Sequence, residues 1–292
     1  LNTDGITLEG FEVRNSGKWR AGIWVNSNNN TISNNTCSAW CGIYLGGSNN
    51  NVISNNSFTS NGCSGAHLEG SNNNVIFNNT FSSNNNNGIL LEYSSNNTIS
   101  NNNFSNNRHY GINTFYSNNN IIYLNNFINN SDNVYSYGST NIWNSTEKIT
   151  YTYNGKQYTN YLGNYWSDYT GSDEDGDGIG DIPYSIDSDR DNYPLIEQFE
   201  HYFVPTPAQI FDTGRPENPY PSISGKFIGT IRTNTKIIAT KLYTYACEGT
   251  GGHTEHVLIC NSTWCAYAEW EGYKGDWMNI SFNKTVVLMP YE

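Results

Sequence analysis

The stretch GIYLGGSNNNVISNNSF, from Gly42 to Phe58, recurs with small changes along the first half of the chain. The other copies are GIWVNSNNNTISNNTC (22–37), GAHLEGSNNNVIFNNTF (65–81), GILLEYSSNNTISNNNF (88–104) and GINTFYSNNNIIYLNNF (111–127). Each copy begins with a glycine, and the successive glycines lie 20, 23, 23 and 23 residues apart. A repeat of this period indicates a solenoid, in which each unit packs against its neighbours.

Each copy contains short alternating runs such as GIYL and NVIS, separated by clusters of Asn and Gly. Alternation predicts strands, and the clusters predict turns. A unit of this length cannot bury its own apolar face, but copies stacked about 4.8 Å apart can. We therefore expect an all-β chain that begins with a parallel β-helix. The β-branched residues and the Asn-rich turns argue against a helical solenoid, which is the alternative.

One asparagine recurs three residues after the central aliphatic residue of each copy, at Asn35, Asn56, Asn79, Asn102 and Asn125. Asparagine adopts the left-handed backbone conformation more readily than other non-glycine residues. Stacked asparagine side chains also form hydrogen-bonded columns. We expect this asparagine to turn the chain in the left-handed conformation and to form such a column.

The composition is polar but weakly charged, with 14% charged residues and a net charge of −12. An acidic chain lacks the basic footprint of a nucleic-acid-binding protein. It also contains no apolar run of about 18 residues, so we expect no membrane span in this chain. The abundance of Asn, Ser, Thr, Gly and Tyr is typical of β-rich extracellular proteins.

Cysteines and glycosylation sequons point to an exported, cell-surface protein. The short loop in CNSTWC places Cys260 and Cys265 opposite each other if it is a hairpin, within reach of a disulfide. We expect Cys41 and Cys63 to form a second disulfide. The Asn-x-Ser/Thr sequons, which a chain rich in these residues also forms by chance, are at Asn29, Asn34, Asn55, Asn78, Asn96, Asn103, Asn129, Asn144, Asn261, Asn279 and Asn283.

The segment from Asp168 to Asp191 contains nine acidic residues and one basic residue, Arg190. Its pattern D-x-D-x-D-G-x-x-D brings alternate carboxylates onto a turning loop, which suits a hard cation such as Ca²⁺. A standard calcium hand would have Glu where Tyr184 stands. The predicted ligands are Asp173, Asp175, Asp177, the carbonyl of Ile179, and Asp181, completed by Asp187, Asp189 or Asp191. The alternative is a solvated acidic loop.

The repeats, together with the segment from Tyr151 to Leu195, resemble the NosD-like family of right-handed β-helices, especially its archaeal cell-surface members. IFDTGRPENPYPSISG (210–225) and KLYTYACEGTGGHTEHVLICNSTW (241–264) resemble a β-rich module that follows in many archaeal surface proteins. The resemblance implies a right-handed parallel β-helix of about six to seven coils over residues 1–145. It also implies a closing segment with the Ca²⁺ loop over 146–204 and an antiparallel β-sandwich over 205–292. The family label mentions copper, but two methionines and five scattered histidines do not support a copper site.

An enzymatic site is not evident from the sequence. Glu69 and Glu92 stand four residues after the glycines of their copies and therefore share one column of strands, where the alternative is that both are solvated. The aromatic residues form a candidate glycan-binding face, with Trp24, Tyr44, Tyr93, Tyr110 and Phe115. In the last module, His253, Glu255 and His256 form a candidate metal site, where the alternative is a hydrogen-bonded loop.

We expect an exported, glycosylated structural or interaction protein of the cell surface, stabilised by Ca²⁺, that self-associates into a layer or filament or binds other surface proteins. The alternative is a carbohydrate-binding or polysaccharide-active β-helix protein. No catalytic residue is predicted.

Overall fold

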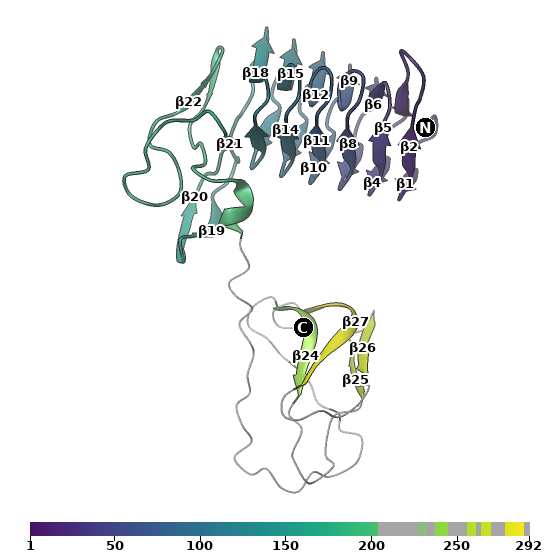
Figure 1. Ribbon diagram of the computed structural model, residues 1–292, viewed down its shortest axis with the longest axis vertical. Helices are drawn as coiled ribbons and strands as arrows, with labels where there is room; N and C mark the ends of the chain where they lie inside the picture. Colours follow the sequence, from purple (N-terminus) through teal and green to yellow (C-terminus); the bar gives the residue numbers. More distant parts are fainter. Residues whose placement is uncertain are drawn as a thin grey trace, which may run out of the picture. The chain divides into compact units, whose positions relative to one another are not determined.

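The computed structural model describes residues 1–203, 228, 231, 237–244, 256–260, 264–269 and 278–288. The chain divides into two compact units, Leu1–Ala208 and Gln209–Glu292. Figure 1 shows the first unit as a stack of short strands that runs from the N-terminus towards a closing segment.

Three parallel sheets wind around the first unit, and successive strands in the chain enter sheet A, sheet B and sheet C in turn. Sheet A contains β1 (Thr7–Glu9), β4 (Thr31–Ser33), β7 (Val52–Ser54), β10 (Val75–Phe77), β13 (Thr98–Ser100) and β16 (Ile121–Tyr123). Sheet B contains β2 (Glu12–Arg14), β5 (Thr36–Ser38), β8 (Ser57–Thr59), β11 (Thr80–Ser82), β14 (Asn103–Ser105), β17 (Asn126–Ile128) and β21 (Tyr165–Trp166). Sheet C contains β3 (Ala21–Val25), β6 (Cys41–Gly46), β9 (Ala66–Glu69), β12 (Ile89–Glu92), β15 (Tyr110–Phe115) and β18 (Asp132–Tyr137).

The core consists of columns of equivalent side chains, one per coil, which are identical over several central coils in sheets A and B. Ile53, Ile76 and Ile99 pair in register across β7, β10 and β13, and all three are fully buried. In sheet B, Phe81 stacks between Phe58 and Phe104 with ring centroids 5.3 and 5.2 Å apart. The predicted parallel β-helix and its stacked apolar column are therefore confirmed.

Buried asparagine ladders run beside these columns. The side chain of Asn79 donates to Asn102 Oδ1 at 3.1 Å, and the backbone amide of Asn79 donates to the same oxygen at 2.9 Å. The same contacts link Asn35, Asn56, Asn79, Asn102, Asn125 and Asn164. A second ladder, which was not predicted, links Asn30, Asn51, Asn74, Asn97, Asn120 and Asn141.

The predicted backbone conformation of the ladder asparagines was wrong. The left-handed residue is the preceding one, such as Asn55 (φ 57°) before Asn56 and Asn78 (φ 55°) before Asn79. In each of these pairs, the first asparagine adopts the left-handed conformation that turns the chain. The second asparagine points inward and forms the hydrogen bonds of the ladder.

Carboxylates end these two ladders, whereas a third ladder, of Asn61, Asn84, Asn107 and Asn130, ends on Asn133. Asp191 Oδ2 accepts hydrogen bonds from the backbone amide of Asn164 at 2.7 Å and from the indole of Trp166 at 3.0 Å. Asp189 Oδ2 accepts the amide of Asn141 at 2.9 Å, as the next asparagine would in a further coil. A carboxylate suits a last rung because it accepts hydrogen bonds and carries no N–H group that would need another acceptor.

Asp191 makes the stability of the first unit depend on pH. Its complete burial raises the pKa of the carboxyl group to about 7, although four N–H contacts act in the opposite direction. The folded state therefore holds a proton that the unfolded state releases near its ordinary pKa of 3.8. The contribution of Asp191 to the free energy of unfolding is present at low pH and is lost as the pH rises from about 4 to about 7.

We expect urea unfolding at several pH values between about 4.5 and about 7.5 to show this loss as a difference between wild type and Asp191→Asn, because asparagine does not titrate. The other carboxylates contribute equally to the pH dependence of stability in wild type and variant, so the difference between the two proteins isolates Asp191. Parallel stability curves for the two proteins would show that Asp191 has the same pKa in the folded and unfolded chains.

The closing segment adds two hairpins and a short helix. The first hairpin pairs β19 (Ile149–Tyr153) with β20 (Lys156–Asn160), and the second pairs β22 (Tyr184–Ile186) with β23 (Asp189–Asp191). The 3₁₀ helix η1 (Phe199–Tyr202) places Tyr202 in a second core with Tyr151 and Leu195. Among the described residues, no helix is long and apolar enough to cross a membrane.

In the second unit, β24 (Ile237–Thr244) pairs with β27 (Met278–Leu288), and β25 (His256–Cys260) pairs with β26 (Cys265–Glu269). Both pairs are antiparallel, as expected for a β-sandwich module, which they represent in part. The structure contains both expected disulfides, Cys41–Cys63 and Cys260–Cys265. Cys37, which is free, lies buried in the sheet B column.

Candidate functional site

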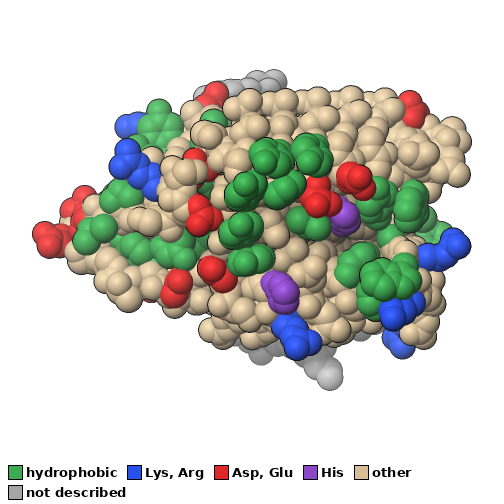
Figure 2. Space-filling model, turned by 90° about the horizontal axis from the view of Figure 1, so that it is seen from above, with side chains coloured by type: hydrophobic (Ala, Val, Ile, Leu, Met, Phe, Trp, Pro, Cys, Tyr) green, Lys and Arg blue, Asp and Glu red, His purple; other side chains and the backbone are tan. Residues whose placement is uncertain are grey.

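The outer surface of sheet C carries a continuous group of aromatic and acidic side chains. Because residues alternate along a strand, Ile43 and Leu45 of β6 point into the core while Tyr44 between them points outward. We call this surface the sheet C face and define it by Trp24, Tyr44, His67, Glu69, Glu92, Tyr93, Phe115, Tyr116, Tyr135 and Tyr137. Figure 2 shows apolar side chains gathered around acidic and histidine side chains on the face seen there.

An open depression of about 490 Å³ occupies the N-terminal part of the sheet C face. Trp24, Tyr44, Glu69 and Tyr93 line it, together with Asn26 and three glycines. One of these glycines, Gly46, makes room for Tyr44, because a Cβ there would lie 2.8 Å from the tyrosine ring. The ring centroids of Trp24 and Tyr44 are 4.4 Å apart, so the two rings form one edge of the depression.

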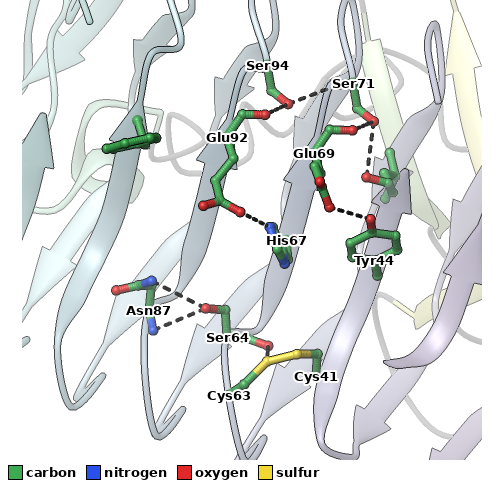
Figure 3. A network of polar contacts seen from close by, with 12 residues as sticks. Cys41, Tyr44, Cys63, Ser64, His67, Glu69, Ser71, Asn87, Glu92 and Ser94 are labelled. Atoms are coloured by element: carbon green, nitrogen blue, oxygen red, sulfur yellow. Dashed lines mark hydrogen bonds and ion pairs between the residues drawn. A yellow bond between two sulfur atoms is a disulfide. The ribbon is translucent and has the colours of Figure 1, made fainter. Parts of the chain in front are cut away.

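Two diagonal hydrogen bonds position the carboxylates of the face (Figure 3). Glu69 Oε2 accepts the hydroxyl of Tyr44 at 2.6 Å, and Glu92 Oε2 contacts His67 Nε2 at 2.7 Å. Each glutamate reaches back to the strand of the preceding coil, and Glu69 and Glu92 are themselves neighbours in register. The expectation that they share a column is therefore confirmed.

Tyr44 stays protonated at neutral pH. Burial raises the pKa of its hydroxyl to about 12, helped by the hydrogen bond to Glu69 and by the negative charges of Glu69 and Glu92. It therefore acts as a hydrogen-bond donor that fixes the Glu69 side chain.

Two tyrosines of the face hold the left-handed backbone conformation. Tyr93 has φ 49° and Tyr116 has φ 46°, at the position where earlier coils have Gly47 and Gly70. This conformation costs a bulky L-residue about 1–2 kcal/mol, whereas glycine adopts it freely. Both rings are exposed and stack on each other with centroids 5.7 Å apart. Backbone geometry alone would favour glycine, so these exposed tyrosines are candidates for a functional role.

The structure brings together most of the aromatic residues that were expected to form a binding face. Trp24, Tyr44, Tyr93 and Phe115 lie on the sheet C face, and Tyr110 stacks at its margin on Tyr135 with centroids 5.3 Å apart. Tyr116, Tyr135 and Tyr137 also lie on this face and were not predicted from the sequence. Their signal was present in the repeat, because outward residues lie two, four and five positions after the first residue of each unit.

The acidic loop gathers three of its predicted ligands. Oxygen atoms of Asp173, Asp175 and Asp177 lie within 4.8 Å of one another. Asp173 accepts backbone amides within the loop, including that of Gly178 at 2.9 Å. Burial raises the pKa of Asp177, and the charges of Asp175 and Asp173 add to this effect.

The other predicted ligands contact different partners. Asp181 accepts the amide of Glu174 at 2.8 Å, and Ile179 is buried beside Leu195. Asp187 accepts the amide of Ser136 at 2.7 Å, which places it at the end of sheet C. Asp189 and Asp191 end the asparagine ladders, as described above.

The repeat itself generates sequons on the surface. In Asn78–Asn79–Thr80, the first residue is the exposed left-handed asparagine, the second is the ladder asparagine, and the third begins β11. Most predicted glycosylation sites in the described residues are exposed, namely Asn29, Asn34, Asn55, Asn78, Asn96, Asn129 and Asn283. Asn103 and Asn144 are half-buried. Asn261 and the Asn279 side chain, like His253 and Glu255, lie outside the described residues.

Solved structures similar to this chain have low similarity scores. The enzymatically active domain of bacteriophage CBA120 tailspike protein 2 matches at 13% identity and a TM-score of 0.38, over 48% of this chain and 23% of its own. A mutant of the periplasmic alginate epimerase AlgG matches at 21% identity and 0.33, over 46% of this chain and 34% of its own. An alginate lyase from Paenibacillus sp. str. FPU-7 matches at 12% identity and a TM-score of 0.24, over 48% of this chain and 89% of its own. No curated protein matches.

A family model described as periplasmic copper-binding protein (NosD) matches residues 1–171. The described residues do not fit copper, which favours clustered histidine, cysteine and methionine ligands. His67 is paired with Glu92, Cys37 is enclosed in the core, and the metal-ligand cluster among described residues consists of three aspartates, which suit harder cations. The match covers more than half of the 292 residues and the repeats that form the β-helix. The chain therefore belongs to the NosD family.

Proposed function

We propose that the protein is an exported surface β-helix protein that binds a glycan on the sheet C face. Export is supported by the periplasmic description of the family and by two disulfides, which persist in oxidising compartments. A location on the cell surface, as expected from the sequence, is part of the same proposal.

The observation that carries the glycan proposal is the open depression in which aromatic rings and a carboxylate converge. Trp24, Tyr44 and Tyr93 offer rings on which the C–H surface of a sugar can pack. Glu69 offers acceptor oxygens to the hydroxyl groups of the sugar. A shallow site with aromatic walls and few placed polar groups fits a sugar chain better than a compact apolar ligand.

Replacing Tyr93 with glycine distinguishes an effect on glycan affinity from an effect on the stability of the fold. We expect the variant to bind its glycan about five-fold more weakly or worse, because a stacked ring is worth about 1 kcal/mol or more. The melting temperature is expected to stay equal or to rise, because glycine relieves the left-handed strain of this position.

The measurement is screening of the full chain on a glycan array, followed by calorimetric titration of wild type and variant. Phe11→Ala is a matched control, because Phe11 is 55% exposed and lies between sheets A and B, away from the sheet C face. Binding that survives Tyr93→Gly but disappears in Phe11→Ala would place the site elsewhere.

We also propose that Ca²⁺ binds the acidic loop and stabilises the closing segment. The support is the convergence of Asp173, Asp175 and Asp177, whose negative charges repel one another without a cation. A chelator is expected to lower the melting temperature, since an ion present at 100 times its Kd contributes about 2.7 kcal/mol. Asp175→Asn should reduce this sensitivity. An identical melting temperature with and without chelator in the wild type would contradict the proposal.

Self-association into a layer or filament stays a prediction from the sequence. Light scattering at high protein concentration with Ca²⁺ is expected to show species larger than a monomer.

A further inference from the structure

We propose that the sheet C face selects glycans that carry no acidic groups, namely neutral sugars or amino sugars, and discriminates against uronates and sulfated sugars. This inference rests on the proposed glycan binding and deepens it by naming the class of ligand. The inference depends on the negative charge of the sheet C face, whereas the proposed glycan binding depends on its aromatic rings and hydrogen-bond acceptors.

Apart from His67, the ionisable acid or base side chains at the centre of the face are the carboxylates of Glu69 and Glu92. Glu69 lines the depression, and Glu92 stands beside it in register on the next coil. No lysine or arginine is among the residues that line the depression, and none occurs between Ala21 and Leu68. His67 is engaged with Glu92 and therefore does not offer a free cation to a ligand. An anionic sugar in the depression would face an uncompensated carboxylate.

Glu69 can accept a hydrogen bond from a ligand that carries hydroxyl or ammonium groups, whereas it repels a ligand that carries an anionic group. Its Oε2 is bound by the Tyr44 hydroxyl, and the structure gives its Oε1 no hydrogen-bond donor from the described residues. The side chain is exposed, so Oε1 is an open acceptor at the edge of the depression. Like charges a few ångströms apart at a surface repel by an amount that corresponds to about ten-fold or more in affinity.

The rings of the face continue the site beyond the depression. Tyr93 stacks on Tyr116, and Phe115 stacks on Tyr137 with centroids 5.4 Å apart, one coil further along. A linear glycan that runs along the stack from Trp24 therefore meets an aromatic ring on each coil except that of β9, which presents His67 and Glu69. Glu92 pairs in register with Glu69 on one side and Phe115 on the other, so negative charge borders this path as well.

The test compares three hexasaccharides of different charge on the full chain at low ionic strength: cello-hexaose, chitosan hexamer and oligo-alginate. We expect the neutral or the amino sugar to bind at least about ten-fold more tightly than the uronate. Glu69→Gln keeps the shape of the side chain and removes its charge. This variant should therefore have a smaller difference in affinity between the uronate and the other two sugars. Glu147→Gln, which removes an exposed charge away from the face, should leave the difference unchanged.

The outcomes separate the inference from the proposed function. If oligo-alginate binds most tightly, through a site that Tyr93→Gly abolishes, the charge selection is wrong while glycan binding on this face stands. If the difference persists in Glu69→Gln, the face selects by something other than this carboxylate, and the inference fails as stated. If no glycan of any class binds, both the inference and the proposed function fail.

Discussion

Replacing Asp191 with alanine is expected to lower the free energy of unfolding of the first unit by about 3 to 5 kcal/mol. The carboxylate is fully buried and accepts hydrogen bonds from the backbone amides of Asn164 and Tyr193 and from the Trp166 indole. Alanine would leave these donors unsatisfied in the interior, and each such donor costs about 1 to 3 kcal/mol. The destabilisation would arise at the last rung of the asparagine ladder that contains Asn56 and Asn79.

Asparagine at position 191 is the informative control. It retains an acceptor oxygen of the same geometry as an internal rung, so Asp191→Asn should cost much less than Asp191→Ala near neutral pH. Urea unfolding of the full chain, followed by far-ultraviolet circular dichroism, measures both. If Asp191→Ala and Asp191→Asn lowered the free energy of unfolding equally, the hydrogen bonds that Asp191 accepts would not be the source of its contribution to stability.

Replacing Phe81 with alanine is expected to cost about 3 to 5 kcal/mol, as for other large-to-small changes in packed cores. Phe81 is fully buried, and its ring stacks between Phe58 and Phe104 in the middle of the column. Because identical coils flank it on both sides, the space left by the ring cannot collapse without shifting those coils.

The outward neighbour provides the control for Phe81. Thr80 precedes Phe81 in β11 and points away from the core, so Thr80→Ala should change the unfolding free energy by less than about 0.5 kcal/mol. Phe81→Leu should cost an intermediate amount. A small effect of Phe81→Ala, similar to that of Thr80→Ala, would contradict the stacked column.

The repeat predicted the β-helix because each coil repeats the same inward residues, and a fixed spacing leaves little freedom in register. Ile53, Ile76 and Ile99 are paired as the alignment of the copies implies. The ladder of Asn56 and Asn79 was also predictable, because a polar residue that recurs in every coil needs a partner that recurs with it. Two adjacent asparagines look alike in the sequence, however, and which one turns the chain depends on the backbone of the whole coil.

The ends of the ladders could not be predicted from sequence spacing. Asp189 and Asp191 belong to an acidic segment that also contains the three clustered aspartates, so composition alone does not separate the two groups. Their position at the last rung depends on how the closing segment folds back over the β-helix, which is a long-range property. The sheet C face was predictable in part, from the outward positions of each copy, but the pairing of Glu69 with Tyr44 and of Glu92 with His67 required side-chain conformations.

The most direct test of glycan binding by the sheet C face is a crystal structure of the full chain with the tightest-binding oligosaccharide from the titrations. We predict sugar rings over Trp24, Tyr44 and Tyr93, with a hydroxyl or amino group donating to Glu69 Oε1. An ordered oligosaccharide bound to another surface, with the sheet C face empty, would contradict the account.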